Sequence, residues 1–79
     1  MHQTVLVNIH ARGRQVYTVG LPFTWNALIR AISDKEEVAV EKIRVVYSGE
    51  VVQYDAQAED GQHYAFDQPE PSVHVMLRR

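Results

Sequence analysis

Alternating hydrophobic and polar positions mark three segments of the chain as strands. Apolar side chains recur at every second position in residues 5–9 and again, with the same period, in residues 15–19. This is the period of a strand with one buried face. The glycine-containing stretch 11–14 between them predicts a hairpin turn. Residues 72–77 repeat the alternation, so the first and last predicted elements are both strands.

A helix is predicted after this hairpin. Apolar residues follow Trp25 at intervals of three, four and seven positions, which places them on one face of an amphipathic helix. Thr24 precedes this pattern and is a favourable N-cap residue. We therefore expect a helix from about residue 25 to 36, with Trp25 in the core or at its edge.

Two shorter strands and a long polar segment follow the helix. Residues 42–47 are rich in β-branched side chains, and the turn-like stretch 48–50 separates them from a short strand at 51–52. Residues 53–71 are mostly polar, yet three aromatic residues make this segment too apolar for a linker. We expect it to pack partly onto the core. The three aromatic residues are Tyr54, Tyr64 and Phe66.

This order of elements predicts one α+β domain, residues 1–79, with the β-grasp fold. In that fold one main helix packs across a mixed sheet whose first and last strands lie side by side in parallel. The inward positions of the pattern predict the core. The predicted core residues are Val5, Val7, Ile9, Tyr17, Val19, Leu28, Ile32, Val45, Val73, Val75 and Leu77.

Composition narrows the possible partners and the compartment. Eight Lys and Arg residues against ten Asp and Glu give a net charge of −2, so we expect no nucleic-acid partner. The chain has no cysteine, which excludes disulfides and Cys-based zinc sites and favours a reducing compartment, the cytoplasm or the nucleus. No apolar run is long enough to span a membrane and none has the pattern of a signal peptide. We expect a monomer that does not bind membranes.

Three blocks of the sequence also resemble ubiquitin and its relatives. Residues 31–38 read AISDKEEV, residues 44–49 read RVVYSG and residues 73–78 read VHVMLR. Their order and spacing are similar to those of ubiquitin, and the last block includes the family's histidine and arginine, here His74 and Arg78. The matches in the first block are Ile32, Asp34, Lys35 and Glu36. The resemblance implies a ubiquitin-like fold.

The resemblance also implies a protein-binding surface. Strand alternation turns Val46, His74 and Met76 away from the helix. The matching residues of ubiquitin form the hydrophobic patch that most receptors bind. We therefore expect recognition of proteins, either receptors or enzymes of the ubiquitin pathway or an attached larger protein. The predicted protein-binding residues are Leu6, His10, Arg44, Val46, Gly49, His74, Met76 and Arg78.

Two departures from the family leave alternative functions open. The sequence ends at Arg78-Arg79 without the two glycines through which ubiquitin is activated, so we expect no conjugation through this stretch. The first alternative is a covalently conjugated modifier whose Gly-Gly tail is absent from this sequence. The second departure is Glu50, which stands where ubiquitin has its best-known chain-linking lysine, so we expect no chains linked through that site. The second alternative is a PB1-like acid–base assembly module, suggested by the acidic residues of segment 55–61.

Catalytic and metal chemistry have little support in the sequence. The serines lie outside any nucleophile-elbow motif, and no glycine-rich phosphate loop is present. We therefore expect a protein that is not an enzyme and binds no cofactor. His10 and His74 are expected to lie on neighbouring strands, but two ligands make a weak metal site. Segment 55–61 lacks the ligand spacing of an EF-hand, and Asp60-Gly61 within it predicts a turn. We expect no bound metal.

Overall fold

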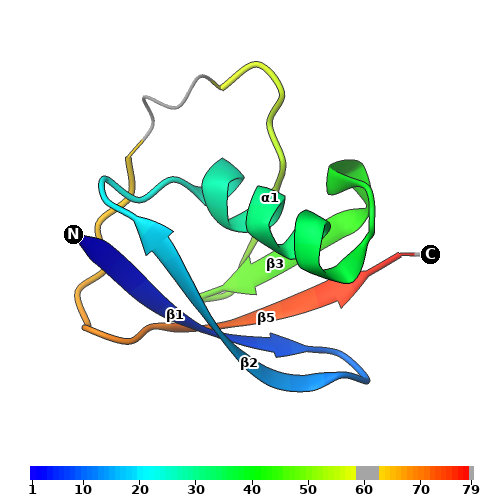
Figure 1. Cartoon of the computed structure of the whole chain (residues 1–79), viewed down its shortest axis with the longest axis horizontal. Coiled ribbons are helices and arrows are strands. Elements are labelled where there is room, and N and C mark those ends of the chain that lie inside the picture. Colours follow the sequence, from blue (N-terminus) through cyan, green and yellow to red (C-terminus); the bar gives the residue numbers. More distant parts are fainter. Residues whose placement is uncertain (59–62, 79) are drawn as a thin grey trace.

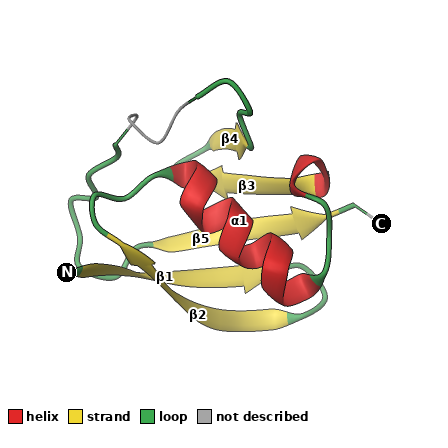
Figure 2. Ribbon diagram, turned by 45° about the horizontal axis from the view of Figure 1, so that its top comes forward, coloured by secondary structure: helices red, strands yellow, loops and turns green. Residues whose placement is uncertain are grey.

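The computed structural model describes residues 1–58 and 63–78, which form one mixed sheet with an α-helix across one face (Figures 1 and 2). In chain order the elements are β1 (His2–Ile9), β2 (Gly13–Gly20), α1 (Trp25–Glu36), the 3-10 helix η1 (Val40–Lys42), β3 (Ile43–Tyr47), β4 (Glu50–Gln53) and β5 (Ser72–Leu77). The strand order is β2-β1-β5-β3-β4. β1 and β5 pair in parallel, and the other neighbours pair antiparallel. The predicted β-grasp fold is confirmed.

The first strand is longer than predicted. β1 begins at His2, because residues 2–4 pair with residues 18–20 of β2. These positions are mostly polar and carry no apolar alternation, but backbone pairing does not require it. The hydrophobic pattern therefore marked only the buried part of this hairpin.

Helix α1 has the predicted bounds, and its two ends are capped. The Thr24 side chain accepts a hydrogen bond from the Ala27 N–H at 3.1 Å, as an N-cap residue does. At the other end Glu37 has a left-handed backbone conformation with φ of 57°, and the Val38 N–H donates to the Ser33 carbonyl at 3.3 Å. This is a common way to end a helix, although glycine is the usual residue at such a position.

The core lies between α1 and the sheet. All predicted core residues are buried except Leu77, which is half-buried at the end of β5. Among the described residues, four members of the buried hydrophobic core were not predicted: Phe23, Ile29, Val38 and Ile43. Phe23 and Val38 precede and follow α1, where no periodic pattern marks an inward position.

The segment after β4 packs on the molecule as predicted, with Tyr54 and Phe66 against the core. Its aromatic rings surround Trp25: the ring centroids of Trp25 and Tyr64 are 5.2 Å apart, and those of Trp25 and Phe66 are 5.5 Å apart. Phe23 and Tyr47 complete the cluster, and Trp25 is partly buried at the edge of the core as predicted. The predicted turn at Asp60-Gly61 lies outside the described residues.

The longest helix of the described chain is α1, with 12 residues. A helix needs about 20 apolar residues to cross a bilayer. None of the helices in residues 1–58 and 63–78 meets this requirement.

Candidate protein-binding face

The side of the sheet away from α1 carries most of the predicted binding residues. Strand alternation buries Val45, Val73 and Val75 beneath the helix, so their chain neighbours point outward. On this outer side His74 of β5 lies opposite Val46 of β3. The next outward pair in the same two strands is Met76 opposite Arg44. The β5 and β3 registers therefore bring these four side chains together.

Two adjoining hollows lie on this outer side. The first, about 340 Å³, is lined by Asn8, Ile9, His10, Gly13, Val46, His74, Val75 and Met76. The second, about 360 Å³, is lined by His10, Arg44, Met76, Leu77 and Arg78. His10 and Met76 line both, and the Met76 side chain is 43% exposed. We call the residues lining these two hollows the binding face. Six of the eight predicted residues belong to it: His10, Arg44, Val46, His74, Met76 and Arg78.

Two predicted residues lie outside the hollows. Leu6 is half-buried one row away, opposite Ser72 of β5. Ser72 Oγ accepts a hydrogen bond from Asn8 Nδ2 at 3.0 Å, and Asn8, in the row of His74 and Val46, lines the first hollow. Gly49 is in the β3–β4 turn with φ of 80°, a backbone conformation that glycine adopts without strain.

Two exposed valines extend the apolar part of this side and were not predicted. Val51 of β4 is 57% exposed and pairs directly with Val46, whose side chain lines the first hollow. Val16 of β2 is 60% exposed and pairs with Leu6. Both could have been found by extending the alternation into β4 and β2. Val51 continues the binding face, whereas Val16 belongs to the separate Leu6 row.

The charge of the binding face is positive. Arg44 and Arg78 line the second hollow, and His10 and His74 add two titratable donors. Among the described residues, no Asp or Glu lines either hollow. The Nε atom of Arg44 is buried and has no hydrogen-bond partner among the described residues. The arrangement suits apolar contact bordered by hydrogen bonds to acidic groups.

The described residues form no candidate metal site. Across residues 1–58 and 63–78 there is no group of three or more His, Asp or Glu side chains that could hold a metal ion. His10 and His74 line the same hollow, but they have no third ligand of this kind in the described chain.

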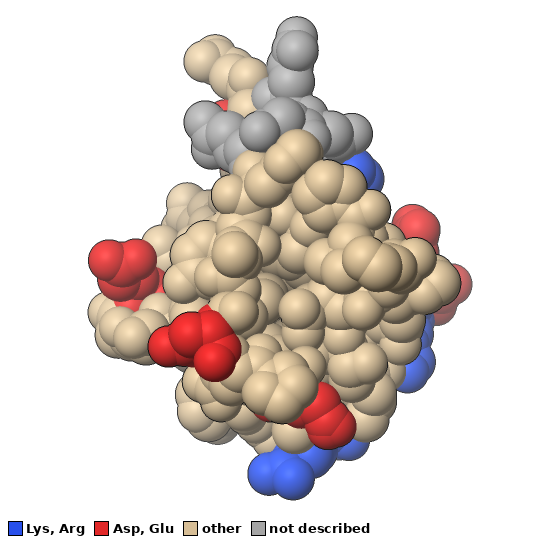
Figure 3. All heavy atoms as spheres, turned by 90° about the vertical axis from the view of Figure 1, so that its left-hand side faces the viewer, with Lys and Arg blue, Asp and Glu red and all other residues tan. Residues whose placement is uncertain are grey.

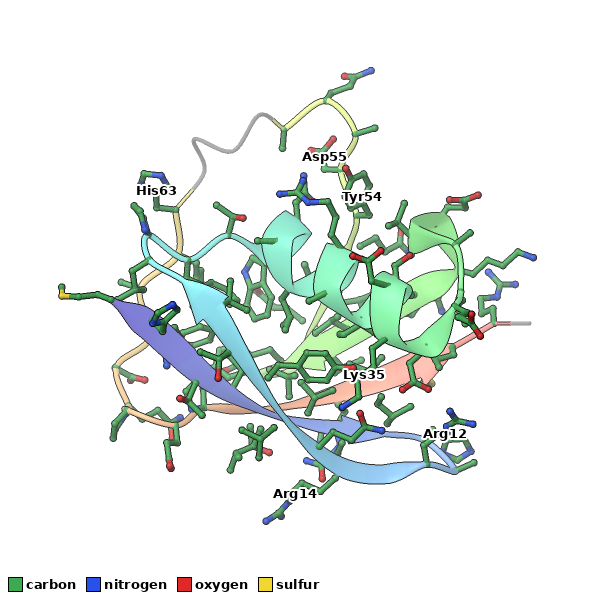
Figure 4. All side chains as sticks on the ribbon, viewed as in Figure 1. Arg12, Arg14, Lys35, Tyr54, Asp55 and His63 are labelled. Carbon is green, nitrogen blue, oxygen red and sulfur yellow. The ribbon has the colours of Figure 1, made fainter. Side chains whose placement is uncertain are left out.

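A separate groove, lined by no Lys, Arg, Asp or Glu of the described residues, lies where β1 starts, away from Arg12 and beside the labelled His63 (Figure 4). Its volume is about 560 Å³, and Leu21 and Tyr64 in its lining are 44% and 39% exposed. Figure 3 views this end of the molecule, where most atoms belong to residues other than Lys, Arg, Asp and Glu. The groove was not predicted, because it depends on the Tyr64 N–H donating to the Phe23 carbonyl across the chain at 2.9 Å.

Solved structures match the whole chain. A ubiquitin of Caldiarchaeum subterraneum matches with a TM-score of 0.72 and 13% identity, over 100% of this chain and 96% of its own. A computationally designed protein based on human erythrocytic ubiquitin matches with 0.71 and 17%, over 98% and 92%. A structure described as "Molecular Mimicry of SUMO promotes DNA repair" matches with 0.65 and 21%, over 96% and 91%. No protein-family model and no curated protein sequence matches. The chain has the ubiquitin-like fold.

Proposed function

We propose that this ubiquitin-like domain is a non-catalytic module that recognises other proteins through the binding face. The observation that carries the proposal is the convergence of apolar and cationic side chains on one side of the sheet. Val46 and Met76 provide apolar contact, and Arg44 and Arg78 border it. An apolar centre with a polar rim is the usual anatomy of a protein interface.

The charge of the face defines the chemistry of the partner. A surface lined by arginine and histidine without carboxylates attracts an apolar segment flanked by Asp or Glu. The hollows are small and shallow, so we expect modest affinity, between about micromolar and millimolar. The fold and the sequence blocks similar to ubiquitin support a role in a ubiquitin-related pathway. In such a role the partner of the domain is a receptor or enzyme of the ubiquitin pathway, or a larger protein to which the domain is attached. We further propose that the domain is a monomer of the cytoplasm or nucleus.

A pair of designed peptides tests the proposal directly. The first is an amphipathic helix of about 20 residues with one apolar stripe flanked by Glu, and the second has Lys in place of every Glu. Titration into the ¹⁵N-labelled domain should shift the amides of Val46, His74 and Met76 with the Glu peptide only. Equal shifts with both peptides, or shifts centred on Leu21 and Tyr64, would overturn the proposal.

Matched variants locate the binding to the face. Val46→Ala combined with Met76→Ala should abolish binding of the Glu peptide. Val16→Ala removes an equally apolar, 60% exposed side chain outside the hollows and should leave binding unchanged. Retained binding in the double variant would contradict the proposed face.

The native gene product, analysed in its own cells, tests whether the domain is a recognition module or a covalent modifier. Immunoblotting with mass spectrometry should show one discrete species without denaturant-resistant adducts. A ladder of such adducts would instead indicate a covalent modifier. Salt-dependent self-association of the purified domain would indicate an acid–base assembly module.

A further inference from the structure

An ion pair connects the turn beside the binding face to the end of the helix. Arg12 Nη2 lies 2.8 Å from Glu36 Oε1, so the contact is an ion pair by distance but lacks the alignment of a hydrogen bond. Glu36 is the last residue of α1, and Arg12 is in the turn between β1 and β2. Figure 4 shows Arg12 on this turn, below the C-terminal end of α1. The pair therefore joins two elements that are far apart in the sequence.

Glu36 occupies an unfavourable position for a carboxylate. Its side chain is only 3% exposed, and a buried charge is strongly destabilising unless it is paired. It is also at the C-terminal end of a helix, where the helix dipole disfavours negative charge. The charge of Glu36 acts on Tyr17, whose buried hydroxyl has no hydrogen-bond partner in the described chain. Lys35 Nζ lies 5.2 Å from the Tyr17 ring centroid. Arg12 is the cation that compensates the carboxylate.

The turn that carries Arg12 has a strained backbone. Ala11 has φ of 68° and Gly13 has φ of 92°, and the left-handed region is unfavourable for alanine. The Arg12 N–H donates to the Ile9 carbonyl at 2.9 Å. A strained turn of this kind persists when surrounding contacts hold it.

The same turn borders the binding face. His10 and Gly13, on either side of residues 11–12, both line the first hollow. The His10 N–H donates to the Val75 carbonyl at 2.9 Å, so the strand is fixed up to this point. Beyond His10 the Arg12–Glu36 ion pair is a side-chain contact between the turn and the helix.

We infer that Arg12 and Glu36 form a latch that holds the β1–β2 turn in the conformation that makes one wall of the first hollow. Both are positioning residues, since neither lines the hollows. The inference deepens the proposed function: the latch sets the shape of the recognition surface, and its importance for binding rests on that function. Its structural part is measured on the free domain.

Amide hydrogen exchange in the free 79-residue chain tests the latch. Arg12→Gln and Glu36→Gln should each accelerate exchange at residues 11–13 by about fivefold or more, and should shift the Met76 methyl resonance. Combining the two substitutions should add little to either one, because both break the same contact. Arg12→Lys keeps the charge and should restore part of the protection.

Two neighbouring residues provide matched controls. Glu37→Gln makes the same chemical change at an exposed glutamate one residue later, and Arg14→Gln makes it at an exposed arginine of the same hairpin. Both should leave exchange at residues 11–13 unchanged. If Glu36→Gln impairs folding, Arg12→Gln, at a side chain that is 51% exposed, carries the test alone.

The outcomes separate the latch from the proposed function. Unchanged exchange at residues 11–13 in the Arg12 variant, or equal acceleration in the controls, overturns the latch whether or not the domain binds the Glu peptide. A loosened turn together with at least about threefold weaker binding of the Glu peptide supports the latch and its role in recognition. A loosened turn in a domain that binds neither peptide supports the latch and overturns the proposed face.

Discussion

Asn26 and Asp55 exchange hydrogen bonds between α1 and the segment after β4. Asn26 Nδ2 donates to the Asp55 carbonyl at 2.8 Å, and the Asp55 N–H donates to Asn26 Oδ1 at 3.0 Å. Nδ2 also donates to the Ala58 carbonyl at 3.2 Å. Since Asn26 is 7% exposed, one nearly buried side chain fastens this segment to the first turn of the helix.

Asn26→Ala should therefore destabilise the domain. Removing three hydrogen bonds and leaving their backbone partners partly buried should cost about 2 kcal/mol, which is roughly 8–16 °C in Tm for a domain of this size. Thermal unfolding followed by the fluorescence of Trp25, the only tryptophan, measures this loss. Gln57→Ala, which removes an exposed amide from the same segment, is the control and should leave Tm within a few degrees. A small effect of Asn26→Ala would mean that contacts other than the Asn26 hydrogen bonds hold the segment after β4 in place.

Truncating the two adjacent valines of β3 should lower the stability of the domain by very different amounts. Val45 is fully buried at 0% exposure, so Val45→Ala should cost about 2–3 kcal/mol. Val46 is half-buried on the other side of the sheet, so Val46→Ala should cost less, about 1 kcal/mol or below. Urea unfolding of the two variants compares them directly. A large loss in the Val46 variant would contradict its assignment to the exposed binding face.

Tyr17 should make the domain sensitive to alkali. Its pKa is raised above the ordinary value of 10.0 by burial and, to a smaller extent, by the charge of Glu36. The folded state then holds the phenol proton more tightly than the unfolded state. Stability is therefore fully present below pH 10 and falls as the pH rises from there through the folded-state pKa.

Tyr17→Phe should reduce this alkaline loss. The Tyr17 hydroxyl has no hydrogen-bond partner among the described residues, so at pH 7 the substitution should be close to neutral. Comparing Tm at pH 8 with Tm above pH 10 gives the readout. Tyr64→Phe, which removes a phenol from a 39% exposed residue, serves as the comparison and should keep the wild-type pH profile. Equal profiles for wild type and Tyr17→Phe would refute this source of alkaline sensitivity.

Glu37→Gly should stabilise the domain. Glu37 ends α1 with φ of 57°, a conformation that is unfavourable for residues with a Cβ and free of strain for glycine. The expected gain is about 1 kcal/mol, measured by chemical denaturation. Glu37→Gln removes the charge and keeps the strain, so it separates the backbone effect from electrostatics. If both variants gain equally, the charge is responsible.

The regular elements could be predicted because each carries its own periodicity. The bounds of α1 and β5 follow from local patterns alone, and the pairing of first and last strands follows from the order of elements. Phe23 and the Asn26–Asp55 contact could not be predicted. Both depend on where the described residues after β4, 54–58 and 63–71, meet the helix, and no local pattern encodes those contacts.

The binding face was predictable to the same extent. Alternation in β3 and β5 places Val46, His74 and Met76 on one side, and strand order brings His10 beside them. Alternation also placed Leu6 there, but Leu6 lies one row away, opposite Ser72, and lines neither hollow. The Arg12–Glu36 pair could not be predicted from the hydrophobic periodicity, because it depends on how close the turn lies to the helix end in three dimensions.

The position of β5 between β1 and β3 has a consequence for how the chain acquires its structure during synthesis. Before β5 is made, the chain can form the β1–β2 hairpin, α1 and the β3–β4 hairpin, but no strand pairing joins the two hairpins. Pairing of residues 6–9 with residues 72–75 then closes a loop that spans most of the chain, and such distant pairing is slow to nucleate. The native sheet therefore forms only once the ribosome has released this strand.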